Sequence, residues 1–317
     1  MSRRRQADRT AGKAGAPNTS ASHTSAASPN TRTTDAGARA ASPSAPAAGP
    51  ELQIGGMALR NGVLFMAGKH WAAAVRRDDG TIEVRSGKRP LVPGRDAVSR
   101  LPLLRGVSRL TESIAVLPAV RRQLGPVLPQ EDPRVFAAAG AGALAGTLLR
   151  HSRHGSPAVR ESVIALLTLA PALLALRDTR IAGYHGAEHK SVAASESGNP
   201  ASGERKEHER CGSMLVAPLL ATSVLGNVAL RRLGAERNPA AVLTVGIVSV
   251  GAAVELFSWA ARHGGHPLAE LIKRPGLHLQ RMATTSEPDE AQLEVAEAAM
   301  SELLRLEGRG LSPSPAA

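Results

Sequence analysis

Residues 183–190 contain two histidines and a glutamate at the spacing of a metal site. His185 and His189 are four residues apart, so they lie on one face of a helix, about 6 Å apart along its axis. Glu188 shares that face, three residues after the first histidine. The order His-x-x-Glu-His is the inverted form of the zinc-peptidase motif, in which the histidines bind the metal and the glutamate handles a proton. The sequence therefore predicts a site for a divalent metal, with zinc as the expected ion and Glu188 as the catalytic base.

Such a site needs further ligands, and the sequence offers several. His208 and Cys211 follow about twenty residues later, on a loop long enough to fold back, and zinc accepts both imidazole and thiolate. They are the expected additional ligands. Two acids remain open. Glu196 lies about 10.5 Å along the helix from His189, so it could bind only if the helix ends early. Glu255 interrupts an apolar segment, and intramembrane carboxylates are costly enough to be functional candidates.

The number of ligands decides the chemistry. If His208 and Cys211 both bind, four protein ligands close the site, and it is structural. If only one of them binds, a position stays open for water, and Glu188 can act as a general base. The sequence thus leaves two functions open: a metal-dependent hydrolase, or a non-catalytic membrane scaffold or assembly factor with structural zinc. Histidines that only form hydrogen bonds on a polar loop are a third alternative.

The elements around this motif are apolar helices. Four segments stand out: residues 135–149, 162–176, 214–230 and 240–261. One span needs about twenty apolar residues, with a range of roughly 17 to 25, so the first three are short or borderline. Charges bracket the segments, which are apolar on every face, and their glycines and alanines suit close helix packing. The missing aromatic belt favours a soluble bundle instead. We predict a mainly α-helical integral membrane bundle of about four spans.

The basic residues predict an orientation for these spans. The two short loops joining segments 1–2 and 3–4 carry six Lys or Arg, against twelve on the other side. This difference places both termini and the His-Glu-His stretch in the cytoplasm, in a multi-pass protein of the cytoplasmic membrane. Cys211, the only cysteine, agrees with a reducing compartment.

The overall charge of +12 also raises nucleic acid as a partner. An aromatic content of 2% leaves little surface for stacking bases, and the basic residues are scattered rather than gathered on one face. We therefore expect the lipid bilayer as the partner and do not expect nucleic acid. A homo-oligomer is compatible with the sequence, which identifies no other protein partner.

The first fifty residues differ from the rest. Residues 1–50 contain no Phe, Trp, Tyr, Leu, Ile or Val and carry a charge of +5, from seven Lys or Arg minus Asp8 and Asp35. Such a tail cannot bury enough apolar surface to offset its ordering entropy, so we predict disorder. Residues 51–308 are predicted to form a single membrane-associated domain, followed by a frayed tail, 309–317.

Within that domain, residues 51–92 predict a small β region with a hairpin turn at residues 78–80. Residues 101–120 predict an amphipathic helix that lies on the membrane or covers the core and is limited by Pro118. The spans and the His/Cys loop occupy residues 135–261. In residues 275–308 we expect a turn at residues 275–276 and a helix that starts at Ser286.

Several stretches carry a resemblance to a known family. They are residues 55–63, residues 103–107 with Glu112-Ser113, the motif Tyr184-His185-Gly186-Ala187-Glu188-His189-Lys190, Arg210-Cys211-Gly212 preceded by His208, and residues 275–296. In these stretches, over about residues 51–308, the chain resembles the YqhQ-like family of bacterial membrane proteins, which carry a domain of unknown function and are described as predicted metal-dependent enzymes. The resemblance implies a multi-span membrane protein with the His/Glu/Cys cluster as its site. It implies no substrate.

Overall fold

A computed structural model of the chain describes residues 52–152 and 156–309. These residues belong to one unit that starts at Pro50. The predicted disordered tail, 1–50, lies outside the described residues. So does the predicted frayed tail, 309–317, apart from its first residue.

An antiparallel sheet forms the amino-terminal part of this unit. Its strands are β1 (Gly55–Leu59), β2 (Gly62–Ala67), β3 (His70–Arg76) and β4 (Ile82–Lys88), and each pairs with the next along the chain. Gly80 has a φ of 85°, and this left-handed conformation closes the β3–β4 hairpin. The predicted β region and its hairpin turn are therefore confirmed, as part of a four-stranded sheet.

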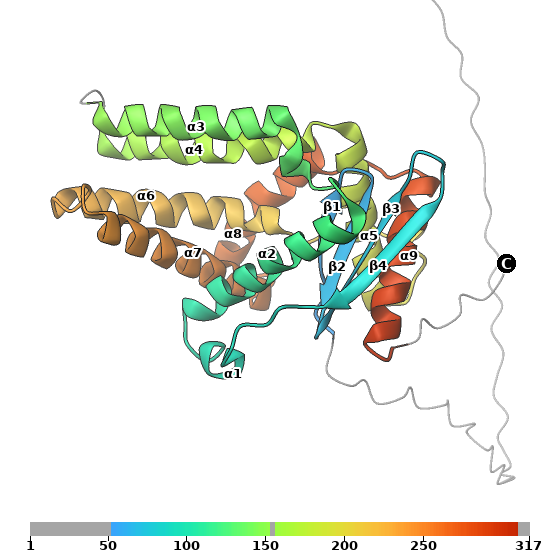
Figure 1. Cartoon of the computed structure of the whole chain (residues 1–317). Coiled ribbons are helices and arrows are strands. Elements are labelled where there is room, and N and C mark those ends of the chain that lie inside the picture. The colour runs from blue at the N-terminus through green and yellow to red at the C-terminus, as the bar shows by residue number, and fades with distance from the viewer. Residues whose placement is uncertain (1–51, 153–155, 310–317) are drawn as a thin grey trace, which may run out of the picture. The chain divides into compact units, whose positions relative to one another are not determined.

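Both faces of the sheet are covered by helices (Figure 1). Successive side chains of a strand point to opposite faces. Val63 and Phe65 accordingly pack on α5 (Thr179–Ser197) and α9 (Glu290–Leu306), whereas Leu64 packs on α2 (Leu104–Leu124). This double covering explains why every residue of β2 is buried. It also anchors α5, the helix of the His-Glu-His motif, to a rigid support.

Long helices follow the sheet in two neighbouring pairs (Figure 1). α3 (Pro133–His151) packs on α4 (Pro157–Leu176), α6 (Val216–Arg232) packs on α7 (Pro239–Arg262), and α4 also contacts α6. Inside the second pair, the Thr222 hydroxyl donates to the carbonyl of Ser249 at 2.9 Å, and the Ser249 hydroxyl donates to the carbonyl of Thr222 at 3.2 Å. These bonds satisfy polar groups between apolar helices.

Three stretches of the described residues are long and apolar enough to cross a membrane: Pro157–Leu176, Gly212–Arg232 and Pro239–Arg262. The mainly helical fold is thus confirmed, with three membrane-capable helices among the described residues where about four spans are predicted. The predicted segment 135–149 does form a helix, α3. Its apolar residues are mostly alanine and glycine, which contribute little hydrophobic surface.

Three local expectations are corrected. Pro118 does not limit its helix, because α2 continues through it to Leu124. Residues 275–276 are not a turn but lie inside α8 (Pro267–Leu279), where a Cβ on Gly276 would be only 2.8 Å from the Cα of Met214. The last helix, α9, is capped by Asp289 rather than Ser286, since Asp289 accepts from the backbone N–H of Gln292 at 2.8 Å.

Candidate metal centre

The helix α5 carries the two histidines. It begins where the Asp178 carboxylate accepts from the backbone N–H of Arg180 at 2.9 Å, and it ends at Gly198, whose φ of 77° suits a helix terminus. Between these ends, His185 and His189 share one face, and their ring centroids are 4.4 Å apart. The helical spacing thus brings the two imidazoles together.

Cys211 folds back onto this pair. One donor atom from each of His185, His189 and Cys211 lies within 4.8 Å of the other two, and the Cys211 Sγ is 3.4 Å from His185 Nε2. Cys211 precedes η3 (Gly212–Leu215), where its sulfur accepts from the backbone N–H of Ser213 at 3.5 Å. This contact from the backbone helps to fix the position of the sulfur, which is a metal-type donor.

Each imidazole is oriented through its other nitrogen. His185 Nδ1 lies 2.7 Å from the carbonyl of Thr284, and His189 Nδ1 lies 2.6 Å from the carbonyl of Lys206. A carbonyl only accepts, so each Nδ1 carries a proton, and in the neutral imidazole Nε2 is then the nitrogen that can bind a metal. Metal-binding histidines are oriented in this way by the atoms behind them.

One of these Nε2 atoms, that of His189, is buried. His189 is 1% exposed, and its Nε2 has no hydrogen-bond partner among residues 52–152 and 156–309. A buried polar atom without a partner is uncommon and calls for an explanation, such as a bound ion. Two imidazoles and a thiol whose donor atoms lie within 4.8 Å of one another fit the ligand preferences of zinc.

Glu188 lies between the two imidazoles. Its Oε2 is 3.8 Å from His185 Nε2 and 3.9 Å from His189 Nε2, and the residue is 7% exposed. Burial raises the pKa of this carboxyl to about 7, against a smaller opposing effect of His185. A carboxyl group with this pKa, beside three metal-type donors, is suited to proton transfer near neutral pH.

The structure places His208 beside this group rather than in it. Its ring centroid is 5.8 Å from that of His189, and its Nε2 lies 3.7 Å from Glu196 Oε2. Glu196 in turn pairs with Arg210. Burial lowers the pKa of His208. His208 and Cys211, the two candidate further ligands on this loop, thus have different partners.

Glu255 is engaged elsewhere. This carboxylate of α7 accepts from the Arg105 guanidinium at 2.7 Å and from the backbone N–H of Leu103 at 3.1 Å. Both partners come from the start of α2, about 150 positions earlier in the chain. The acid in the apolar segment therefore has a countercharge that the sequence does not reveal.

Sequence reasoning missed the groups that orient the ligands. The carbonyls of Thr284 and Lys206 have no signature in the sequence, because every residue carries one. The motifs also indicated no role for the side chain of Gln280, which contacts the loop of Cys211. Gln280 lies within residues 275–296, one of the stretches that resemble the family, and this resemblance was the signal that could have pointed to it.

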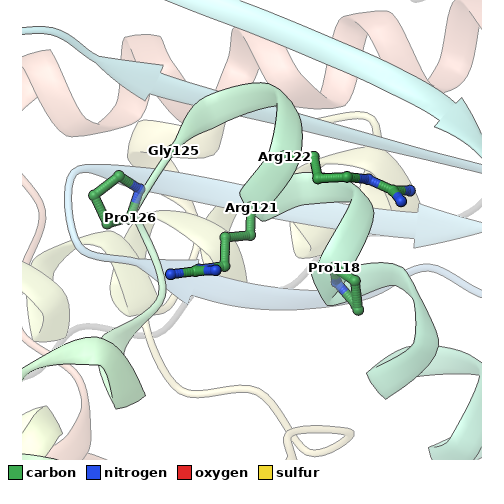
Figure 2. Close-up of a pocket in the computed structure, with 5 residues that line it drawn as sticks. All are labelled: Pro118, Arg121, Arg122, Gly125 and Pro126. Atoms are coloured by element: carbon green, nitrogen blue, oxygen red, sulfur yellow. The ribbon is translucent and has the colours of Figure 1, made fainter.

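Two surface hollows lie outside this cluster. The larger, about 370 Å³, lies at the end of α2 and is lined by Pro118, Arg121, Arg122, Gly125 and Pro126 (Figure 2). Figure 2 shows the two arginines pointing in different directions, and Arg121 pairs with Glu131. They do not converge on one ligand. A smaller hollow, about 170 Å³, lies between α4 and α6.

Comparisons with known proteins show which sequences the chain is similar to. A model described as "Protein of unknown function (DUF1385)" matches residues 162–306, a stretch that contains α5, the Cys211 loop and α9. A Bacillus subtilis (strain 168) protein described as "Uncharacterized protein YqhQ" is 28% identical, with 80% of this chain and 92% of the relative covered. These two matches support assignment of the chain to a YqhQ-like family. No solved structure matches it. The chain thus combines membrane-type helices with a His/Cys cluster inside the matched stretch.

Proposed function

We propose that this YqhQ-like protein is a metal-dependent hydrolase of the cytoplasmic membrane, with His185, His189 and Cys211 as ligands of a zinc-type ion. The observation that carries the proposal is the meeting of these three donors around the orphaned Nε2 of His189. The Nδ1 atom of each imidazole bonds to a backbone carbonyl, an arrangement that orients metal-binding histidines. The site therefore has the donor set and the orientation that binding requires.

The hydrolytic part rests on what lies beside the donors. Three protein ligands leave one coordination position open, which is the arrangement of catalytic rather than structural zinc sites. The ion, when bound, supplies Lewis-acid activation of water and of a carbonyl or phosphoryl group. Glu188 Oε2 lies within 4 Å of both Nε2 atoms, so its carboxylate can accept the proton of an attacking water and later return it to the leaving group.

The arrangement of the chain supports a cytoplasmic location for the site. The sheet packs on α5 and α9, so the segments before α3 and after α4 share one side of the membrane. If α4 spans, α3 must cross with it. With 19 residues at 1.5 Å each, α3 reaches about 28 Å, close to the roughly 30 Å of the hydrocarbon layer. Four crossings and the excess of basic residues on one side then support a cytoplasmic site, with both termini on that same side.

A second function has one observation in its favour. His208 lies next to the cluster, with its ring 5.8 Å from that of His189, on the same loop as Cys211. A modest turn of this side chain would make it a fourth ligand, and the ion would then staple the loop to α5. The protein would in that case be a non-catalytic scaffold or assembly factor with structural zinc.

Metal content tests the proposal directly. The full chain, purified from membranes, is analysed for zinc beside His185→Ala and Cys211→Ser. We expect about one equivalent in the wild type and its loss in both variants, because each removes one of three ligands. A Glu196→Gln variant, outside the group of donors, should keep the metal. A wild-type chain without metal, or variants that retain it fully, would refute the site.

A further inference from the structure

A single π-helical turn, η4 (Gln280–Thr284), contacts both halves of the metal site. It joins α8 to the segment that leads into α9. At its end, the carbonyl of Thr284 accepts from His185 Nδ1 at 2.7 Å. At its start, the side chain of Gln280 reaches the loop that carries Cys211. Such π-helical turns occur frequently at functional sites.

The amide of Gln280 makes three hydrogen bonds to that loop. Its Oε1 accepts from the backbone N–H of His208 at 2.8 Å. Its Nε2 donates to the carbonyl of His208 at 3.1 Å and to the hydroxyl of Ser213 at 2.7 Å. Gln280 is 0% exposed, so water does not compete for these groups. The bonded residues bracket Cys211, three positions before it and two after it.

A side-chain amide is the group that this position demands. It must accept from one N–H and donate to two oxygens, and among long side chains only glutamine does both in a neutral form. A glutamate would place a charged acceptor against the carbonyl of His208, which can only accept. The backbone of Ser213 and Met214 also packs against Gly276, so α8 contacts the segment that directly follows Cys211.

We infer that Gln280 is the positioning residue that holds the thiol of Cys211 within reach of the two imidazoles. The inference rests on the proposed metal site and extends it to a residue that touches neither the ion nor a ligand side chain. Without these three hydrogen bonds, the loop would become ordered only on metal binding, and the entropic cost of ordering it would weaken that binding. Removing groups that orient ligands typically lowers metal affinity by about 10–100-fold.

The only cysteine of the chain provides the test. The metal-free full-length protein, in detergent, is treated with a thiol reagent at increasing zinc concentration, and the concentration that half-protects Cys211 is measured. We compare the wild type with Gln280→Met, which has a similar shape and cannot form the three bonds. The matched control is Gln292→Met. Its amide also joins two segments, accepting from the N–H of Asp289 at 3.1 Å and donating to the carbonyl of Arg180 at 3.3 Å, away from the loop.

We expect Gln280→Met to raise the half-protecting zinc concentration about 10–100-fold, and Gln292→Met to leave it near the wild-type value. If Gln280 only stabilises the fold, Gln280→Met should lower thermal stability as Gln292→Met does. The two variants should then have the same half-protecting zinc concentration. Equal half-protection in Gln280→Met and wild type overturns the inference and leaves the metal site intact. A wild-type thiol that zinc does not protect overturns the proposed site itself.

If Gln280→Met does not accumulate as folded protein, Ser213→Ala decides instead. It removes one of the three bonds and keeps the N–H that points at the Cys211 sulfur. We expect a smaller shift in the same direction, and an unchanged half-protecting concentration overturns the inference.

Discussion

Gly56 of β1 lies directly against the side chain of Glu188. A Cβ at residue 56 would be 2.3 Å from Oε1 and 2.6 Å from the Cγ of Glu188, closer than real Cβ contacts allow. The sheet therefore determines where this carboxylate can lie. The neighbouring Gly55 has no heavy atom of the described residues within 4 Å of the same ideal position. A side chain at position 56 would therefore displace the carboxylate of Glu188, whereas one at position 55 would not, so Gly55 provides a matched control.

Gly56→Ala should displace the carboxylate of Glu188 and leave the metal ligands in place. Misplacing a reacting group by about 1 Å can cost roughly 100-fold in rate. We expect the variant to bind zinc like the wild type but to fail to complement a strain that lacks the gene, at an expression level where Gly55→Ala complements. Equal complementation by the two variants would contradict a role for the position of Glu188.

Glu188→Gln separates the hydrolase from the scaffold. The amide keeps the size of the side chain and removes its ability to accept a proton, which contributes about 10²- to 10⁴-fold in general base catalysis. We expect zinc content and thermal stability close to the wild type, together with loss of complementation. Full complementation by this variant would eliminate the catalytic role and favour structural zinc.

His208→Ala tests whether the site is open or closed. Gln280 bonds only to backbone atoms of His208, so the alanine variant retains these hydrogen bonds. We expect about one equivalent of zinc in His208→Ala and none in His189→Ala, measured on purified protein. Loss of zinc from His208→Ala would show that this imidazole turns from Glu196 to become the fourth ligand.

Arg105→Ala should weaken the contact between α2 and α7. It leaves the carboxylate of Glu255 without its countercharge in an apolar segment, and breaking such a pair costs more than removing both partners. We expect several-fold less folded protein in membranes for Arg105→Ala, and recovery in the double variant with Glu255→Gln. A double variant that accumulates less than Arg105→Ala would contradict this role of the pair.

Labelling of single cysteines tests the orientation. In the Cys211→Ser chain, Glu236→Cys lies in the α6–α7 connection and Glu297→Cys lies on α9, both at exposed positions. We expect a membrane-impermeant maleimide to label Glu236→Cys in intact cells and Glu297→Cys only after lysis. Labelling of both in intact cells, or the reverse pattern, would overturn the cytoplasmic placement of the site.

The sequence by itself determined the features that depend on neighbouring residues. The spacing of His185, Glu188 and His189 placed them on one helical face, because helix geometry is local. Apolar runs located the long helices for the same reason, including α3, which composition alone does not identify as long and apolar enough to span. The hairpin at residues 78–80 followed from local turn chemistry.

The tertiary structure alone decided which distant groups meet. Whether Cys211 or His208 turns toward the imidazoles depends on how a loop packs on α8 and Gln280, some seventy residues away. The partner of Glu255 lies about 150 residues earlier. Contacts over such separations arise from the packing of whole elements, and a pattern within one segment carries no information about the face that another segment presents to it.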